Sequence, residues 1–103
     1  NYVYPSVGTS NTTIYNPTTT GIQSTIIGMT ISNRSAAPIT VSAMLTSGAN
    51  TAYIVKDAVV PVGGALVPVG GDQKIVVEQN DSVVVSANTT SSADCILSVL
   101  EIT

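Results

Sequence analysis

Short segments in which apolar and polar residues alternate recur along this chain, and turn residues separate them. In Thr25–Ser32 the side chains of Ile27, Met29 and Ile31 fall on one face, because successive side chains of a strand point to opposite sides. The segment 39–45 alternates in the same way, and its inward residues are expected to be Ile39, Val41, Ala43 and Leu45. With residues 33–38 as the connection, the two segments predict an antiparallel hairpin.

The same pattern continues along the chain and predicts about seven or eight short strands with loops every 8 to 12 residues or so. The chain contains 15 Val, 10 Ile and 14 Thr, and these β-branched residues suit a pleated sheet better than a helix. The sequence therefore predicts an all-β fold, a single antiparallel β-sandwich of immunoglobulin-like or jelly-roll type. Its 103 residues fit one domain. We expect residues 11–103 to form that domain and residues 1–10 to form an extended N-terminal arm.

The middle of the chain carries signals of a sheet edge. Residues 52–60 form an expected strand that Lys56 and Asp57 interrupt, either as a bulge or at an edge. The sequence Val-Pro-Val-Gly-Gly then occurs twice, and proline cannot donate to a strand ladder, so this stretch belongs at an edge or at a crossover between sheets. Such a segment is open to a partner, and its candidate interface residues are Lys56, Asp57, Pro61 and Pro68.

The two ends of the chain supply the other interface candidates. The last expected strand, Cys95–Ile102, is apolar on both faces. Such a strand is expected to be central in its sheet or to have its outer face covered by another subunit. We expect Leu97 and Val99 to take part in that contact. Tyr2 and Tyr4 are expected to anchor the arm on a neighbour, because tyrosine offers a large contact area with a polar tip.

The side chains that carry most enzyme chemistry are scarce. The chain has no histidine and one cysteine, so the usual zinc, copper and haem ligand sets and the Ser-His-Asp and Cys-His arrangements cannot form. Cys95 has apolar neighbours and is expected to be a core residue. The six acidic residues are scattered mainly at turns and strand ends, where an acid usually caps a turn or is solvated. We expect no catalytic residue, no metal and no cofactor, and therefore a protein that is not an enzyme.

Charge and hydropathy exclude further classes of partner. Only 9% of the residues are charged, three basic against six acidic, so the chain cannot offer a basic stripe to nucleic acid. Serine and threonine supply most of the polar surface, and such a nearly neutral surface suits packing in an array. No apolar run approaches the roughly 18 to 20 residues that span a bilayer. We expect neither nucleic-acid nor membrane binding.

Three segments, in this order, resemble a known group of proteins. They are VPVGGAL at 60–66, VVEQND at 76–81 and SVLEI at 98–102. They resemble the VPAGxxL stretch, the LVLEAGD turn and the closing SxLEI strand of the small β-sandwich virion proteins of tailed bacteriophages. Asn80 stands where that pattern has glycine, which is compatible with the turn because asparagine tolerates left-handed backbone conformations.

The resemblance implies a non-enzymatic virion subunit, first of all a capsid decoration (cement) protein. Such a protein would lie on the surface of the phage head, bind the major capsid protein or other virion proteins, and bridge and stabilise capsomers as a homo-dimer or homo-trimer. The alternative is a neck, tail or fibre component of the virion. A carbohydrate-binding or adhesin-like module is a third possibility, against which stands the absence of Trp and Phe for stacking on sugars.

Overall fold

The structure is a computed structural model, and it describes residues 2–69 and 74–102. Nine strands and no helix are found in these residues. Their bounds are β1 (Tyr2–Val7), β2 (Thr12–Tyr15), β3 (Gln23–Asn33), β4 (Ile39–Ser47), β5 (Asn50–Val60), β6 (Ala65–Val69), β7 (Ile75–Glu78), β8 (Ser82–Ala87) and β9 (Ala93–Ile102).

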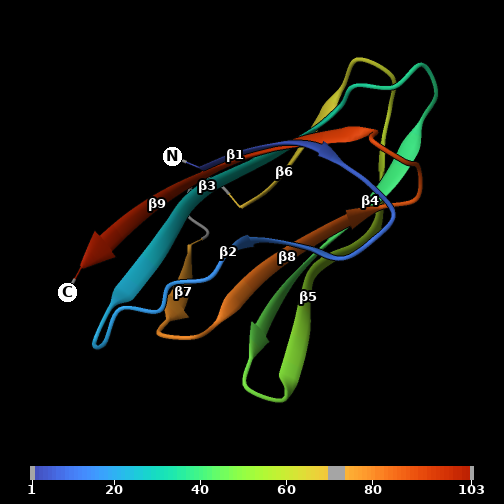
Figure 1. Cartoon of the computed structure of the whole chain (residues 1–103). Coiled ribbons are helices and arrows are strands. Elements are labelled where there is room, and N and C mark those ends of the chain that lie inside the picture. The colour runs from blue at the N-terminus through green and yellow to red at the C-terminus, as the bar shows by residue number, and fades with distance from the viewer. Residues whose placement is uncertain (1, 70–73, 103) are drawn as a thin grey trace.

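The strands form two antiparallel sheets that pack face to face (Figure 1). The five-stranded sheet has the order β1-β9-β3-β6, and β7 pairs with the other half of the β3 edge that β6 occupies. The four-stranded sheet has the order β2-β8-β4-β5. The predicted single β-sandwich is therefore confirmed.

The core between the sheets is built from the residues that alternate inward. Val83, Val85 and Ala87 of β8 face Met29 and Ile31 of β3, and all five are buried. Branched side chains of this kind have few rotamers and pack at high density. The alternation therefore identified the inward face of β8 correctly, and that of β4 as well.

The predicted hairpin between residues 25–32 and 39–45 is wrong, because β3 and β4 lie in different sheets. The connecting segment crosses the sandwich and is held by Asn33. The Asn33 amide donates to the carbonyls of Ala37 (2.8 Å) and Val60 (3.1 Å), and its oxygen accepts from the backbone N–H of Ser35 (2.8 Å). Alternation shows which side of a strand is buried, but it does not show which strand is the neighbour.

The prediction that Ile27 shares the inward face of Met29 and Ile31 is also wrong. Ile26 opposes Val99 and Gly28 opposes Ser98, so Ile27 is an extra residue in β3. Such a β-bulge shifts the alternation by one position. Ile26 is consequently buried and the Ile27 side chain is 46% exposed.

The expected arm is, over residues 2–7, an edge strand of the sandwich. Strand β1 pairs with β9, with Val3 opposite Ile96 and Tyr4 opposite Cys95. Val7 at its end is buried in the core. The segment gives a weak strand signal because Pro5 and the left-handed Ser6 (φ 60°) interrupt it.

The structure of the middle of the chain agrees with the bulge, sheet edge and crossover that its sequence predicts. Strand β5 is an edge strand whose pairing with β4 shifts register around Lys56 and Asp57, and Asp57 has a φ of 51°. The first Val-Pro-Val-Gly-Gly copy leads from β5 in one sheet to β6 in the other. The predicted bulge, edge and crossover are confirmed. Part of the second copy, residues 70 and 71, lies outside the described residues.

Candidate interaction face

Polar side chains from both sheets meet inside the sandwich around Tyr15. The Tyr15 hydroxyl of β2 lies 2.6 Å from the Ser24 hydroxyl of β3 and donates to Glu101 of β9 at 2.5 Å. Burial, together with the hydrogen bond to Glu101, raises the pKa of Tyr15 to about 12. A hydroxyl that keeps its proton at neutral pH and is fully hydrogen-bonded serves to hold the sheets together.

The other reactive side chain is also in the core. Cys95 is 1% exposed, and burial raises the pKa of its thiol to about 11. A thiol with a raised pKa is a poor nucleophile, because the thiolate is the reactive form. Among the described residues no group of three acidic, cysteine or histidine side chains is placed to hold a metal ion.

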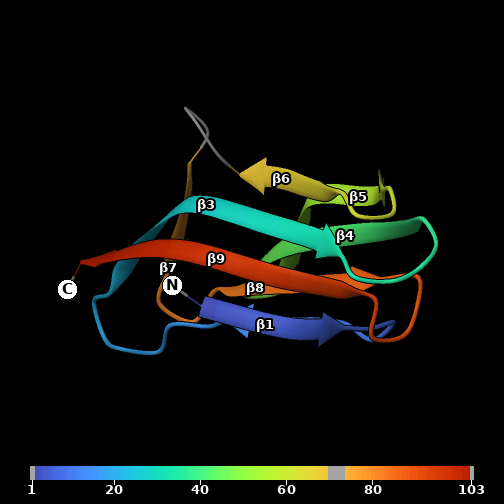
Figure 2. The same ribbon diagram turned by 90° about the horizontal axis from the view of Figure 1, so that it is seen from above.

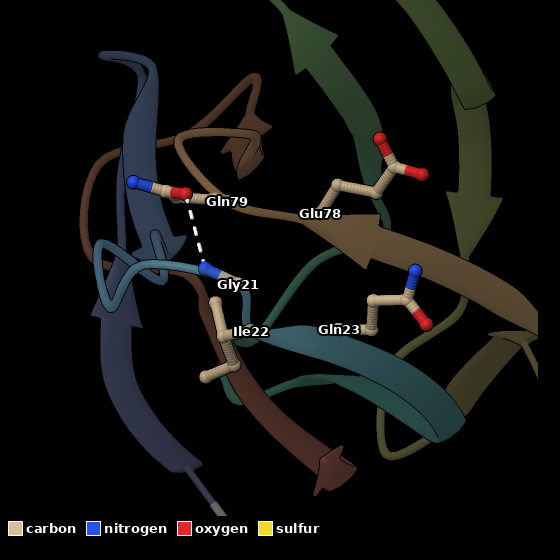
Figure 3. A pocket seen from close by; sticks show the side chains of 5 residues that line it. All are labelled: Gly21, Ile22, Gln23, Glu78 and Gln79. Carbon is tan, nitrogen blue, oxygen red and sulfur yellow. Dashed lines mark hydrogen bonds between the residues drawn. The ribbon is translucent and has the colours of Figure 1, made fainter. Parts of the chain in front are cut away.

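A shallow depression of about 230 Å³ lies where β3 begins and β7 ends, lined by Gly21, Ile22, Gln23, Glu78 and Gln79 (Figure 3). The Gln79 side-chain oxygen accepts from the Gly21 N–H at 3.2 Å. Figure 3 shows the Glu78 carboxylate directed away from this hydrogen bond. Glu78 is the one ionisable side chain among the five, so the depression has no acid–base pair.

The outer face of the five-stranded sheet, which Figure 2 shows from above, carries most of the exposed large apolar side chains of the described residues. Strand pairing places Val3, Ile96 and Thr30 in one row across it, and Leu100, Thr25 and Val76 in another. Ile27 and Val67 lie on the same side, because their neighbours Ile26 and Leu66 point inward. We call this surface the apolar face and define it by its exposed apolar residues, Val3 (68% exposed), Ile27, Val67, Val76, Ile96 and Leu100 (55%).

The outer face of the four-stranded sheet has a different composition. Two of its rows, Ser42–Ser86 and Thr46–Ser82, are polar, but the row between them joins Val84, Met44 and Tyr53. Its large exposed apolar side chains, Tyr53 and Val59, are both on the edge strand β5. Antiparallel sandwiches normally turn polar side chains outward on both sheets. Here the outer face of the five-stranded sheet exposes six large apolar side chains, and that of the four-stranded sheet exposes two.

Charged side chains flank the apolar face. Near one end Arg34 contacts Asp94 at 3.3 Å and also donates to the Ser6 hydroxyl. Around β7, the exposed residues Lys74 and Glu78 lie two positions before and two positions after Val76. The Arg34–Asp94 ion pair is about half exposed, so its contribution to stability is small. The six residues that define the face carry no charge.

The structure does not gather the predicted interface residues on this face. Tyr2 and Tyr4 pair with the inward residues Leu97 and Cys95, and the Tyr2 ring packs against Tyr15 with centroids 4.9 Å apart. Leu97 is 1% exposed and Val99 is half-buried toward the core. Leu97 is a core residue and is not available to a partner.

The other predicted interface residues lie elsewhere on the molecule. Lys56 lies over the ring of Tyr53, 5.2 Å from its centroid, on the edge strand of the four-stranded sheet. Asp57 occupies the bulge in β5, and Pro61 lies in the exposed turn after this strand. Pro68 is half-buried and lies in the edge strand β6. The exposed outward residues of β9 are Ile96 and Leu100. The signal in the sequence that separates them from Leu97 and Val99 is Cys95. A buried cysteine shows which side of the strand is inward, and Leu97 and Val99 lie on the same side as Cys95.

Comparison of the chain with family models, with curated proteins and with solved structures finds no match in any of the three. Among the described residues, no helix is long and apolar enough to cross a membrane.

Proposed function

We propose that this chain is a non-enzymatic structural subunit of a tailed-phage virion, and specifically a capsid decoration protein. It binds the outside of the head, bridges neighbouring capsomers and stabilises the shell. The resemblance of residues 60–66, 76–81 and 98–102 to small phage sandwich proteins supports the class. The observation that carries the proposal is the contrast between the two outer faces of the sandwich.

An exposed apolar sheet face is unfavourable in an isolated domain, because it contacts water. In an assembly the same face can be buried between subunits. Contiguous apolar patches on soluble proteins mark sites of association. Burial of six large side chains in contacts between subunits adds apolar area, and binding that favours the assembled state stabilises it by mass action. The opposite face, which exposes fewer large apolar side chains, then stays in water. No step of this role needs a reactive side chain.

Immunogold electron microscopy of phage particles that carry this chain tests the assignment. Gold spread over intact heads supports a decoration protein at capsomer boundaries. Gold confined to the neck, tail or fibres replaces decoration with a role as a component of those structures. Unlabelled particles, in a preparation where the antibody detects the free chain on a blot, refute the virion assignment.

A further inference from the structure

The sheet edges are poorly suited to pairing with another chain. Pro5 and Ser6 interrupt β1, two register shifts interrupt β5, and Pro68 lies in β6. The other two edge strands, β2 and β7, have four residues each. Bulges, prolines and short strands are the features that prevent edge-to-edge association. Association is therefore directed to a face.

The centre of the apolar face has a knob beside a hollow. The bulge at Ile27 pushes this side chain out of the sheet. The next residue, Gly28, has no side chain, and a Cβ built there would meet nothing closer than the Ser98 Cβ at 4.0 Å. Gly28 and Ser98 are cross-strand partners, so two small residues form the hollow next to the Ile27 knob. A surface with a knob adjoining its own hollow is complementary to a copy of itself.

The extent of the face suits a dimer. The central strands β3 and β9 have 11 and 10 residues. The edge strands β1, β6 and β7 add six, five and four residues, and at about 3.3 Å per residue and 4.8 Å between strands the whole sheet covers about 570 Å² in projection. The accessible area of protruding side chains exceeds the projected area, and a standard interface buries about 800 Å² on each partner. The face alone can therefore supply one side of a stable contact.

The order of the knob and the hollow along β3 selects an orientation. Ile27 directly precedes Gly28 in this strand. In an antiparallel arrangement of two faces, the strands run in opposite directions, so that Ile27 of each copy can lie over Gly28 of the other. A parallel arrangement places Ile27 over Ile27 and leaves both hollows empty.

We propose that a second copy of this chain covers the apolar face, in an antiparallel back-to-back dimer with Ile27 of each copy over Gly28 and Ser98 of the other. Two such sheets would pack about 10 Å apart, as sheets in a sandwich do. The inference deepens the proposed function by naming the partner of its assembly surface, and it rests on that function only in treating the apolar face as such a surface.

Light scattering coupled to size-exclusion chromatography of the purified full chain measures the state directly. We expect the mass to be twice that of the 10.5 kDa chain and to fall toward one chain on dilution. A mass of one chain from micromolar to millimolar concentration overturns the proposal. Gold on phage heads together with a monomeric chain refutes the dimer and leaves the decoration role intact. A dimeric chain together with phage particles that carry no gold label supports the dimer and refutes the decoration role.

Two variants identify the face used, each checked for folding by circular dichroism. Ile96→Glu places a charge at the proposed contact and is expected to raise the dissociation constant at least about a hundredfold. The control is Val59→Glu, a strand position on the other sheet that is 66% exposed against 46% for Ile96, and this variant should leave the constant within about twofold. Loss of the dimer in V59E with its retention in I96E overturns the proposal.

Gly28→Val keeps the test sharp if I96E fails to fold. Nothing lies within contact distance of a new Cβ at Gly28 except Ser98, and valine suits a strand better than glycine. The variant monomer should be at least as resistant to heat as the parent. Because the valine fills the hollow that receives Ile27, the dissociation constant should rise at least about tenfold. An unchanged or lower constant refutes the placement of Ile27.

Discussion

The Tyr15 hydroxyl is a polar link between the two sheets, and its removal has a calculable cost. Tyr15→Phe leaves the ring against Tyr2 but deletes the contacts to Ser24 and Glu101. Ser24 is fully buried, so its hydroxyl would lose its partner out of reach of water, which costs about 1–3 kcal/mol. Glu101 is exposed and water replaces the lost bond, so it adds little. We expect Y15F to lower the free energy of unfolding by about 2 kcal/mol at neutral pH.

The pH dependence of this loss provides a second and sharper signature. The tyrosine pKa is 10.0 in the unfolded chain and about 12 in the folded one. A raised folded pKa means that the unfolded state releases its proton first, so stability is complete below pH 10 and is lost as the pH rises toward 12. At 1.36 kcal/mol per pH unit, two units correspond to about 2.7 kcal/mol, of which about 2 kcal/mol is lost by pH 11.5.

Urea denaturation followed by far-ultraviolet circular dichroism measures the difference. Cys95 must be replaced in both proteins, because burial raises the pKa of its thiol from 9.0 to about 11 and removes stability in an overlapping range. In the Cys95→Ala background we expect Y15F to be about 2 kcal/mol less stable than its parent at pH 9 and about equal to it at pH 11.5. Tyr53→Phe, at an exposed tyrosine, should match its parent at both. A gap for Y15F that stays constant with pH refutes the reasoning.

Substitutions at four further positions test other elements of the fold by the same denaturation assay. Leu97→Ala should lower the free energy of unfolding by about 2–5 kcal/mol, because the side chain is 1% exposed and its removal leaves a cavity. A loss below about 1 kcal/mol would contradict the burial of Leu97. Asn33→Ala removes the side-chain hydrogen bonds that hold the crossover between the sheets and should lower the free energy of unfolding by about 3 kcal/mol. Its control, Ser35→Ala, keeps the two hydrogen bonds that the Asn33 amide donates and should lower it by about 1 kcal/mol. Asn80→Gly should stabilise by up to about 1 kcal/mol, because Asn80 has a φ of 69°, and Asn80→Val should destabilise by more than that.

The sequence shows which side of most strands faces the core, but it does not show which strands lie next to one another. Alternation places Val83 and Val85 inward because a strand has only two faces, and one of them must meet the core. It could not assign β3 and β4 to different sheets, since a six-residue connection suits both a hairpin and a crossover. Ile27 could not be placed either, because the bulge depends on the partner strand β9, which lies about 70 residues further along the chain.

The same limit explains the outcome for the candidate site. The doubly apolar last strand did indicate a central strand with an outer face to cover, and β9 is central. The residues chosen for contact, Leu97 and Val99, were nevertheless the inward ones. Apolarity is equal on both faces of this strand, so composition alone gives no preference. The choice needs the register with β3, in which Met29 opposes Leu97 and Thr30 opposes Ile96.

The low charge of this chain makes the difference between its two faces consequential. A chain with a net charge of −3 and 9% charged residues has little electrostatic repulsion to keep copies apart. With both sheets apolar outside, such a chain would associate without limit, because each copy would offer two apolar faces. With both polar, it would have no apolar surface on which to associate. Because the large exposed apolar side chains are concentrated on one face, association through that face can stop after a single round, with the less apolar face and the interrupted edges left exposed. The covered sheet can then act as the rigid centre of a subunit whose loops contact something larger.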